Sequence, residues 1–178
     1  ILNQQARDVD VVTFHGLGFR IVRQWSRRLG FDHDRLTVYG PDEVRGVIRE
    51  LAQAIGGEVQ RWPLDELVQQ VERFRFSGEV SCVEAVPRLA QELEDALRLQ
   101  NAVDFAAMLA LPLRLFRQHP DVLRLCQDAY RQLLSDEFQD VSEAQYALLR
   151  QLAERQSNLL VVGDPSQSLY AWRGAGPL

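Results

Sequence analysis

Two acidic clusters in the C-terminal part of the sequence have the residue types that phosphate chemistry needs. The first, Asp136 and Glu137, follows the apolar residues 133–134, and the second contains Asp164 and follows the apolar residues 159–162. An Asp at the end of a strand can hold Mg²⁺, which prefers hard oxygen ligands. A neighbouring Glu can orient or deprotonate the water that attacks a phosphoryl group. The clusters therefore indicate metal-assisted phosphoryl chemistry.

Two glutamines accompany the acidic clusters. Gln139 and Gln167 each carry an amide that both donates and accepts hydrogen bonds, so each can contact a terminal phosphate and respond to its loss. An isolated Asp–Glu pair such as Asp136 and Glu137 is usually no more than a solvated turn. The whole string of residues 133–175 favours the phosphate interpretation over that alternative.

A strand, a helix and a second strand are predicted to position these residues. The apolar runs at 133–134 and 159–162 predict the strands, and the amphipathic segment 142–154 predicts the helix between them. This order is typical of a parallel βαβ unit, in which functional residues collect at the carboxyl ends of the strands. Both acidic clusters fall at such ends.

Three motifs of the sequence resemble those of superfamily 1 helicases. The string SDEFQD at 135–140 resembles motif II, and GDPSQSLYAWRGA at 163–175 resembles motif III. The string VTFHGLG at 12–18 resembles the TFHG/TFHS motif of the same family. Their order and spacing match the UvrD/Rep/PcrA branch of 3′-to-5′ DNA helicases. The resemblance extends from end to end, although the middle matches only as a helical pattern.

The resemblance implies roles in ATP hydrolysis for five residues. Asp136 matches the magnesium ligand, and Glu137 matches the catalytic base that activates water. Gln167 matches the residue that senses the γ-phosphate and couples it to DNA, and Gln139 and Asp164 complete the nucleotide-sensing set. The resemblance therefore implies ATP and Mg²⁺ as ligands of the intact protein.

Contacts with single-stranded DNA, and with junctions between single and double strands, are also implied by the resemblance. Thr13 and His15 are expected near the backbone of the strand, and Tyr170, Trp172 and Arg173 are expected near its bases. Aromatic faces stack on any base and so bind without reading sequence. A neighbouring guanidinium suits a phosphate or a π-face. A Trp is by itself more often a core residue, but within this motif we expect Trp172 to contact DNA.

A run of helices is predicted for the middle of the sequence, and the family places the insertion called subdomain 1B there. A strand is expected before it, at Val9 to Thr13. A helix starting near Asp104 contains Pro112, which removes a backbone donor and is expected to kink or split the helix. Asp104 and Phe105 also resemble a dipeptide of the family, or are simply a helix N-cap followed by a core Phe. Apolar stripes at helical spacing predict further helices at 14–29, 41–55, 63–77, 84–99 and 121–130.

Composition narrows the class of protein without deciding its partner. The apolar fraction of 46% is sufficient for a core and excludes a disordered chain. No apolar run reaches transmembrane length and no signal peptide is visible, so no membrane partner is expected. Cys82 and Cys126 lack metal-ligand spacing, which is typical of a reduced, cytoplasmic protein.

The formal net charge of −5 does not exclude DNA binding, because binding depends on a local groove. Four arginines follow the TFHG-like motif at near-helical spacing. They either face DNA phosphates or form an ordinary solvated helix face, and the second alternative is slightly favoured for any one of them. These arginines are Arg20, Arg23, Arg27 and Arg28.

Departures from the family pattern limit what this chain is expected to do alone. All 20 basic residues are Arg, so the P-loop ending in Gly-Lys-Ser/Thr cannot occur in this sequence. The arginines that relatives supply from a second motor domain are not expected within it either. Ile1 indicates an excised segment of a longer protein, which by itself should not hydrolyse ATP. Ser135 stands where a branched apolar residue is usual.

We therefore expect an α/β fold that is mostly α-helical by content. A helical 1B-like subdomain at 15–130 is expected to join two parts of a RecA-like, parallel-sheet P-loop NTPase domain, at 1–14 and 131–178. The expected function is that of a fragment of an ATP-dependent DNA helicase that moves 3′ to 5′ along single-stranded DNA.

Two alternatives to this function stay open. One is a helicase–nuclease subunit of the AddA/RecB kind. Such proteins tend to carry a Lys-Gln pair in motif III and Phe at the position of Trp172, so Pro165-Ser166-Gln167 argues against it. The other is a non-catalytic remnant that binds single-stranded DNA. The oligomeric state is not indicated.

Overall fold

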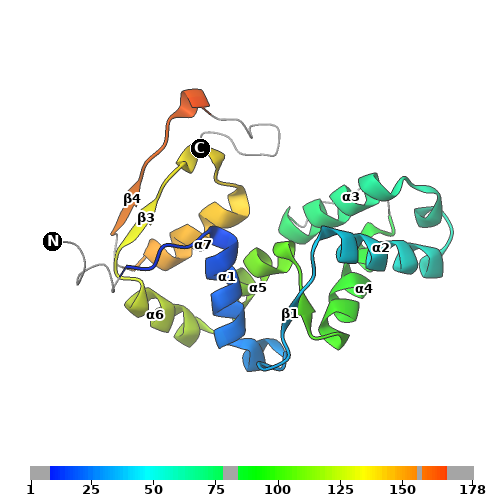
Figure 1. Cartoon of the computed structure of the whole chain (residues 1–178), viewed down its shortest axis with the longest axis horizontal. Helices are drawn as coiled ribbons and strands as arrows, with labels where there is room; N and C mark the ends of the chain where they lie inside the picture. Colours follow the sequence, from blue (N-terminus) through cyan, green and yellow to red (C-terminus); the bar gives the residue numbers. More distant parts are fainter. Residues whose placement is uncertain (1–8, 78–83, 156–157, 168–178) are drawn as a thin grey trace.

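Helices dominate the chain, and two short pairs of parallel strands connect them (Figure 1). The computed structural model describes residues 9–77, 84–155 and 158–167. Within these residues the strands are β1 (Thr37–Val38), β2 (Ala102–Val103), β3 (Leu133–Ser135) and β4 (Leu159–Val161). The helices are α1 (Phe14–Gln24), α2 (Pro41–Ile55), α3 (Leu64–Ser77), α4 (Val86–Leu99), α5 (Phe105–Gln118), α6 (Pro120–Ala129) and α7 (Glu143–Ala153).

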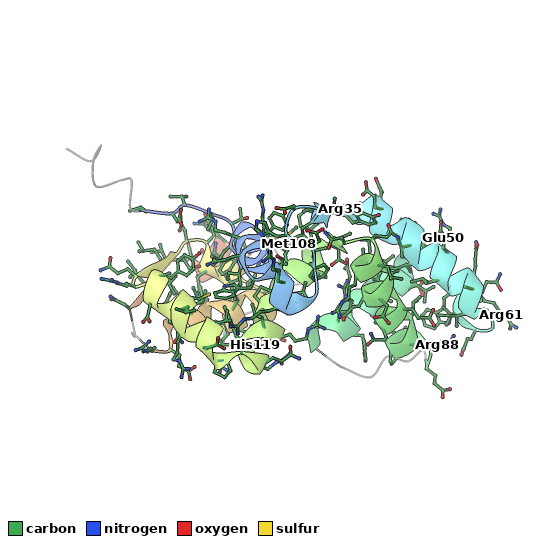
Figure 2. The ribbon with its side chains drawn as sticks, turned by 90° about the horizontal axis from the view of Figure 1, so that it is seen from below. Arg35, Glu50, Arg61, Arg88, Met108 and His119 are labelled. Atoms are coloured by element: carbon green, nitrogen blue, oxygen red, sulfur yellow. The ribbon has the colours of Figure 1, made fainter. Side chains whose placement is uncertain are left out.

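Two lobes lie on either side of α5 (Figure 1). The strand lobe contains α1, α6, α7, β3 and β4, and its core includes Ile21, Phe116 and Leu148. The helical lobe contains α2, α3 and α4, and its core includes Ile48 and Leu89. Met108 of α5 is part of the core of the strand lobe and lies beside α1 (Figure 2), while Asp104, at the start of α5, pairs with Arg75 of the helical lobe. The helix α5 therefore supports both halves of the molecule.

The parallel pair β1–β2 joins the two cores at the base of α5. Thr37 is in register with Ala102, and Val38 is in register with Val103. Successive side chains of a strand point to opposite sides, and here Ala102 enters the core of the helical lobe while Val103 enters the core of the strand lobe. One strand of two residues thus contributes to both cores.

Most of the predicted helices are confirmed, but the first is shorter than expected. Thr13 caps α1 through its hydroxyl, which accepts from the Gly16 amide at 3.0 Å. The helix ends at Gln24, and a separate 3-10 helix, η2, covers Ser26–Leu29. Gly30 closes it with a φ of 82°, a backbone conformation that Gly adopts without steric cost.

The strand expected at Val9 to Thr13 is not observed. These residues pair with no strand of the described chain, and the Val11 side chain is 91% exposed. An extended segment becomes a strand only when a neighbour accepts and donates its backbone hydrogen bonds, and no apolar pattern can supply that neighbour. The strand prediction is therefore wrong for the described residues of this segment.

Asp104 is the N-cap of α5, as one of the two interpretations of the Asp-Phe dipeptide predicted. Its carboxylate accepts from the Ala107 amide at 2.7 Å. The same carboxylate accepts two hydrogen bonds from Arg75 of α3, at 2.5 and 3.1 Å. The prediction of a core Phe is wrong, because Phe105 is 48% exposed.

The helix α5 continues through Pro112, so the expected split does not occur. Proline has no N–H, which leaves the carbonyl of Met108, four residues earlier, without its helical donor. Gly18 of α1 packs against this carbonyl so closely that a Cβ on Gly18 would lie 2.0 Å from the Met108 oxygen. The absence of a side chain at Gly18 therefore lets the backbones of α1 and α5 meet where α5 lacks a hydrogen bond.

None of the helices in the described ranges combines the length and apolar character that a membrane span requires.

Gly18→Ala is expected to lower the free energy of unfolding by about 2 kcal/mol or more, because the added methyl group overlaps backbone atoms that cannot move aside. Gly46→Ala is the matched control, since Gly46 also lies inside a helix but a Cβ there meets nothing within 4 Å. That control should gain about 0.5–1 kcal/mol from helix propensity. Urea unfolding measures both values, and equal effects of the two substitutions would contradict the proposed backbone contact.

Candidate functional site

The strands β3 and β4 form the predicted parallel βαβ unit together with α7. Ser135 is in register with Val161, and the pairing continues beyond the strands, where the Val162 amide donates to the Ser135 carbonyl at 2.8 Å. A capping box starts α7, in which Ser142 and Gln145 bond to each other's backbone amides. This unit brings the residues after β3 and after β4 to the same edge of the sheet.

The backbone turns sharply at Glu137. Its φ is 50° and its ψ is 42°, a left-handed conformation that is uncommon for a residue with a side chain. The 3-10 helix η4 (Phe138–Asp140) follows at once, and the Phe138 amide donates to the Val162 carbonyl at 2.9 Å. Conformations of this kind cost about 1–3 kcal/mol and tend to occur at functional sites. The turn leaves the side chains of Asp136 and Glu137 exposed.

The side chain of Gln139 connects the two acidic clusters. Its amide nitrogen donates to Glu137 Oε2 at 2.6 Å, and its amide oxygen accepts from the Asp164 backbone amide at 3.0 Å. Gly163 permits this contact, because a Cβ at Gly163 would lie 2.6 Å from the Gln139 oxygen. One glutamine amide thus links the catalytic candidate of the first cluster to the backbone of the second.

Asp164 organises the 3-10 helix η5 (Pro165–Gln167). Its carboxylate accepts from the hydroxyl of Ser166 at 2.7 Å, from the Ser166 amide at 3.0 Å and from the Gln167 side chain at 2.8 Å. These hydrogen bonds, led by the one from the Ser166 hydroxyl, lower the pKa of Asp164 below its ordinary value. The Gln167 side chain is therefore held by the carboxylate of Asp164.

Asp136 fits a magnesium ion in the way that this ion is usually held. Its carboxylate is exposed, and one oxygen accepts from the Glu137 amide at 2.9 Å. Among the residues that the structure describes, no group of three or more His, Cys, Asp or Glu side chains could hold a metal. Mg²⁺ commonly binds through one or two carboxylates while its other ligands are water and substrate phosphates. A single exposed carboxylate therefore fits a metal that arrives with a phosphate ligand.

Two buried oxygen atoms near the clusters lack hydrogen-bond partners among the described residues. They are Ser135 Oγ, at the end of β3, and Asp140 Oδ1, at the end of η4. A buried polar atom without a partner is costly, and such atoms often mark a position that a ligand or water completes. The sequence marked Ser135 as a departure from the family pattern, but its burial could not be predicted from the residue type.

The residues predicted to contact DNA are only partly described by the structure. Thr13 caps α1, and the His15 ring packs edge-on against Phe105 with centroids 5.6 Å apart and planes at 71°. Burial lowers the pKa of His15. Tyr170, Trp172 and Arg173 lie outside the described residues. Phe105 is the aromatic residue that the sequence placed in the core and the structure places at the surface.

Two of the four arginines that follow Thr13 are engaged within the chain. Arg20 pairs with Asp10 at 2.6 Å, and Arg28 pairs with Asp121 at 2.8 Å. In both pairs the arginine and the aspartate side chains are substantially exposed. This arrangement agrees better with a solvated helix face than with a row of arginines free for phosphates.

Comparison with known proteins places the whole chain in one family. The sequence model described as UvrD/REP helicase N-terminal domain matches residues 1–178. The chain is 31% identical to the ATP-dependent DNA helicase PcrA of Bacillus subtilis (strain 168) over 186 residues, which cover 98% of the chain and 25% of the relative.

Two further relatives have the same pattern of coverage. The PcrA protein of Leuconostoc citreum is 29% identical over 180 residues, covering 96% of the chain and 24% of the relative. The ATP-dependent DNA helicase UvrD1 of Mycobacterium tuberculosis (strain ATCC 25618 / H37Rv) is 28% identical over 195 residues, covering 98% of the chain and 25% of the relative. The chain thus spans about a quarter of the length of these relatives.

Gln139→Ala is expected to release the backbone amide of Asp164. Hydrogen exchange of the Asp164 amide, followed by NMR, should become about fivefold to tenfold faster, because its hydrogen bond to the Gln139 side chain is lost. Gln60→Ala changes an exposed glutamine of the helical lobe and serves as the control. Unchanged protection of the Asp164 amide in Gln139→Ala would show that the bridge does not hold the second cluster.

His15 is expected to titrate below pH 6.5, because burial disfavours its charged form. Since the folded pKa lies below the unfolded value, this group favours folding above pH 6.5, and its contribution is lost as pH falls through the folded pKa. NMR titration measures the pKa directly. Phe105→Ala should move it back toward 6.5, whereas Leu125→Ala, on an exposed face of α6, should not. A His15 pKa above 6.5 would contradict the packing described here.

Proposed function

We propose, because the chain belongs to the UvrD/REP helicase N-terminal domain family, that the intact protein is an ATP-dependent DNA helicase. It moves 3′ to 5′ along single-stranded DNA, couples ATP hydrolysis to unwinding and acts at junctions between single and double strands. The observation that supports this most directly is the Gln139 bridge, which connects the motif II carboxylate of Glu137 to the motif III backbone at Asp164.

The residues after β3 supply the hydrolytic chemistry in this proposal. Mg²⁺ bound at Asp136 together with the phosphates of ATP would neutralise the charge that develops on the transferred group. Glu137 orients the attacking water and takes its proton, and the left-handed backbone at this position sets the direction of its carboxylate. The Gln139 amide holds that carboxylate at 2.6 Å, which positions the base before the substrate is bound.

The residues after β4 supply the coupling to DNA in this proposal. A change in the position of Glu137 on loss of the γ-phosphate passes through Gln139 to the Asp164 amide. Asp164 in turn holds Ser166 and Gln167, which lead along the chain to Tyr170, Trp172 and Arg173. The sensing role belongs to Gln139, Asp164 and Gln167. The single strand is contacted by Tyr170, Trp172 and Arg173 of motif III together with Thr13 and His15.

One of the two cores, that of the strand lobe, contains residues of both proposed subdomains. Residues 1–14 and 131–178 are assigned to a RecA-like motor domain, and residues 15–130 to the helical insertion of this family. Leu148 and Leu152 of α7 pack in the same core as Ile21 of α1 and Phe116 of α5. The motor segment and the insertion are therefore joined by apolar contacts, which suits a unit that moves as one body during ATP turnover.

Glu137→Gln in the intact protein is expected to lower ATP turnover by at least about 100-fold, because the amide cannot accept the proton from water. The affinity for ATP should stay within a few-fold, since the binding of the phosphates does not depend on this proton. Glu143→Gln, an exposed residue in the first turn of α7, is the control. Steady-state hydrolysis and ATP binding measure the two effects. Turnover within a few-fold of the parent protein would remove Glu137 from the role of base.

A further inference from the structure

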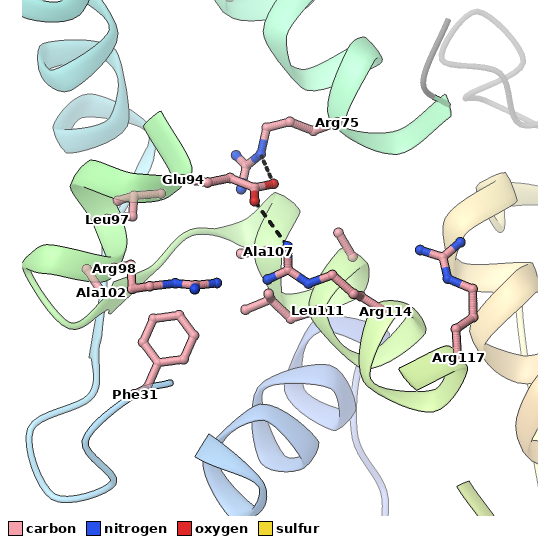
Figure 3. Close-up of a pocket in the computed structure, with 11 residues that line it drawn as sticks. Phe31, Arg75, Glu94, Leu97, Arg98, Ala102, Ala107, Leu111, Arg114 and Arg117 are labelled. Atoms are coloured by element: carbon pink, nitrogen blue, oxygen red, sulfur yellow. Dashed lines mark hydrogen bonds and ion pairs between the residues drawn. The ribbon is translucent and has the colours of Figure 1, made fainter. Parts of the chain in front are cut away.

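A cavity of about 210 Å³ lies where the two lobes meet, between α3, α4, α5 and the segment after η2. Four arginines line it, Arg75, Arg98, Arg114 and Arg117, together with a single carboxylate, that of Glu94 (Figure 3). Small residues of β2 and α5, including Ala102, Ala107 and Ala110, leave the space open. A cluster of this composition is unexpected in a chain whose formal net charge is −5.

The buried end of the cavity contains a donor without an acceptor. Arg75 has only 3% of its side chain exposed, and its two terminal nitrogens donate to Asp104. Its Nε has no hydrogen bond within the described residues, and it lies 3.8 Å from Glu94 Oε1, too far for one. A buried N–H is costly to leave unpaired. An acceptor that enters the cavity would relieve this cost.

The other arginines leave further donors available. Arg114 gives one hydrogen bond to Glu94, at 3.2 Å, and Arg98 lies 5.9 Å from the centre of the Phe31 ring. Arg98 and Arg114 extend toward one another from α4 and α5 (Figure 3). Neither Arg98 nor Arg117 forms an ion pair with a carboxylate of the described residues. The cavity and its walls therefore hold four guanidinium groups against the carboxylates of Glu94 and Asp104, an excess of two positive charges.

We propose that this cavity is a binding site for a terminal phosphate, the doubly charged end group of a phosphate monoester. Guanidinium groups recognise phosphate through pairs of charge-assisted hydrogen bonds. The excess charge of the cavity matches that of a phosphate monoester, which carries close to two negative charges at neutral pH. Its volume is smaller than the roughly 300–1,000 Å³ of pockets that enclose whole small molecules, so the cavity suits the end group and leaves the rest of the ligand outside.

The proposed site is separate from the acidic clusters after β3 and β4, and it does not depend on the function proposed above. Two sources can supply a terminal phosphate: a free mononucleotide or the 5′ end of a DNA strand. Both present the same group to the arginines, so the chemistry of recognition is shared. The cavity lies between the two cores, so occupation of it would also connect α4 of the helical lobe to α5.

Titration with inorganic phosphate at constant ionic strength tests the site directly, using the whole 178-residue chain. We expect saturable shifts of the amide signals of Ala107, Ala110 and Leu111 in ¹H–¹⁵N spectra. Arg98→Gln and Arg117→Gln should each weaken binding by up to about tenfold, because each removes a charge-assisted donor. Arg124→Gln, an exposed arginine of α6 outside the cavity, is the control and should leave the affinity unchanged.

Glu94→Gln gives a second test with the opposite sign. The substitution removes the negative charge of Glu94 from the cavity. Because the neutral amide holds Arg114 less strongly than the carboxylate does, Arg114 is freer to bind phosphate, which should bind several-fold more tightly. A purely structural role for Glu94 would weaken binding or leave it unchanged. Shifts that do not saturate, equal losses in Arg98→Gln and Arg124→Gln, or no gain in Glu94→Gln would each overturn the proposal.

The source of the phosphate is distinguished by comparing three ligands under the same conditions. Thymidine 5′-monophosphate tests the free nucleotide, and a short single strand with a 5′-phosphate is compared with the same strand ending in a 5′-hydroxyl. Preference for the phosphorylated strand would identify a strand end, and binding of the monophosphate alone would identify a free nucleotide. Equal binding of the two strands, with no binding of the monophosphate, would rule out a terminal-phosphate site.

Discussion

The buried ion pair between Arg75 and Asp104 is the constraint on which the arrangement of the two lobes depends. Only 3% and 5% of these side chains are exposed, and removing two charges from water costs several kcal/mol per ion unless each charge is fully compensated. Asp104 compensates by serving two purposes, since the carboxylate that receives Arg75 from α3 also caps α5. Any shift of α3 relative to α5 would separate these two buried charges. The pair therefore sets where the helical lobe meets the helix that both lobes share.

The helix α5 connects this ion pair to the rest of the chain, because it also packs against α1 and α7. At its start it is tied to α3 through Asp104, and one turn later the Met108 carbonyl, left without a helical donor by Pro112, meets Gly18 of α1. Its apolar residues Leu115 and Phe116 share a core with Leu148 of α7. The helix α7 in turn connects β3 to β4. The position of the acidic clusters thus follows, through one continuous core, from contacts made far from them in the sequence.

The edge of the β3–β4 pair combines a fixed backbone with exposed side chains. Glu137 has a left-handed backbone that is costly for its residue type, while its carboxylate stays accessible and is held by Gln139. The same glutamine accepts the Asp164 amide, so the two loops cannot move independently without losing a hydrogen bond. Such a link suits a site in which the loop after β3 contacts a phosphate and the loop after β4 must change position when that phosphate is lost. The arginine-lined cavity lies elsewhere, between the cores, and its chemistry is that of anion binding alone.

The sequence by itself determined the features that depend only on residues close together in the chain. Apolar spacing predicted the helices, the βαβ order predicted the parallel pair β3–β4, and the motif strings identified the family that the comparison confirmed. The tertiary structure alone decided what depends on partners distant in the chain. Val9 to Thr13 forms no strand because none of the described residues pairs with it. The helix α5 continues through Pro112, and Gly18 of α1 packs on the carbonyl that this proline leaves without a helical donor. The Gln139 bridge and the arginine cavity likewise join residues separated by about 20 or more positions. Hydrogen bonds and close packing depend on distances in space, and a linear pattern of residue types does not contain those distances.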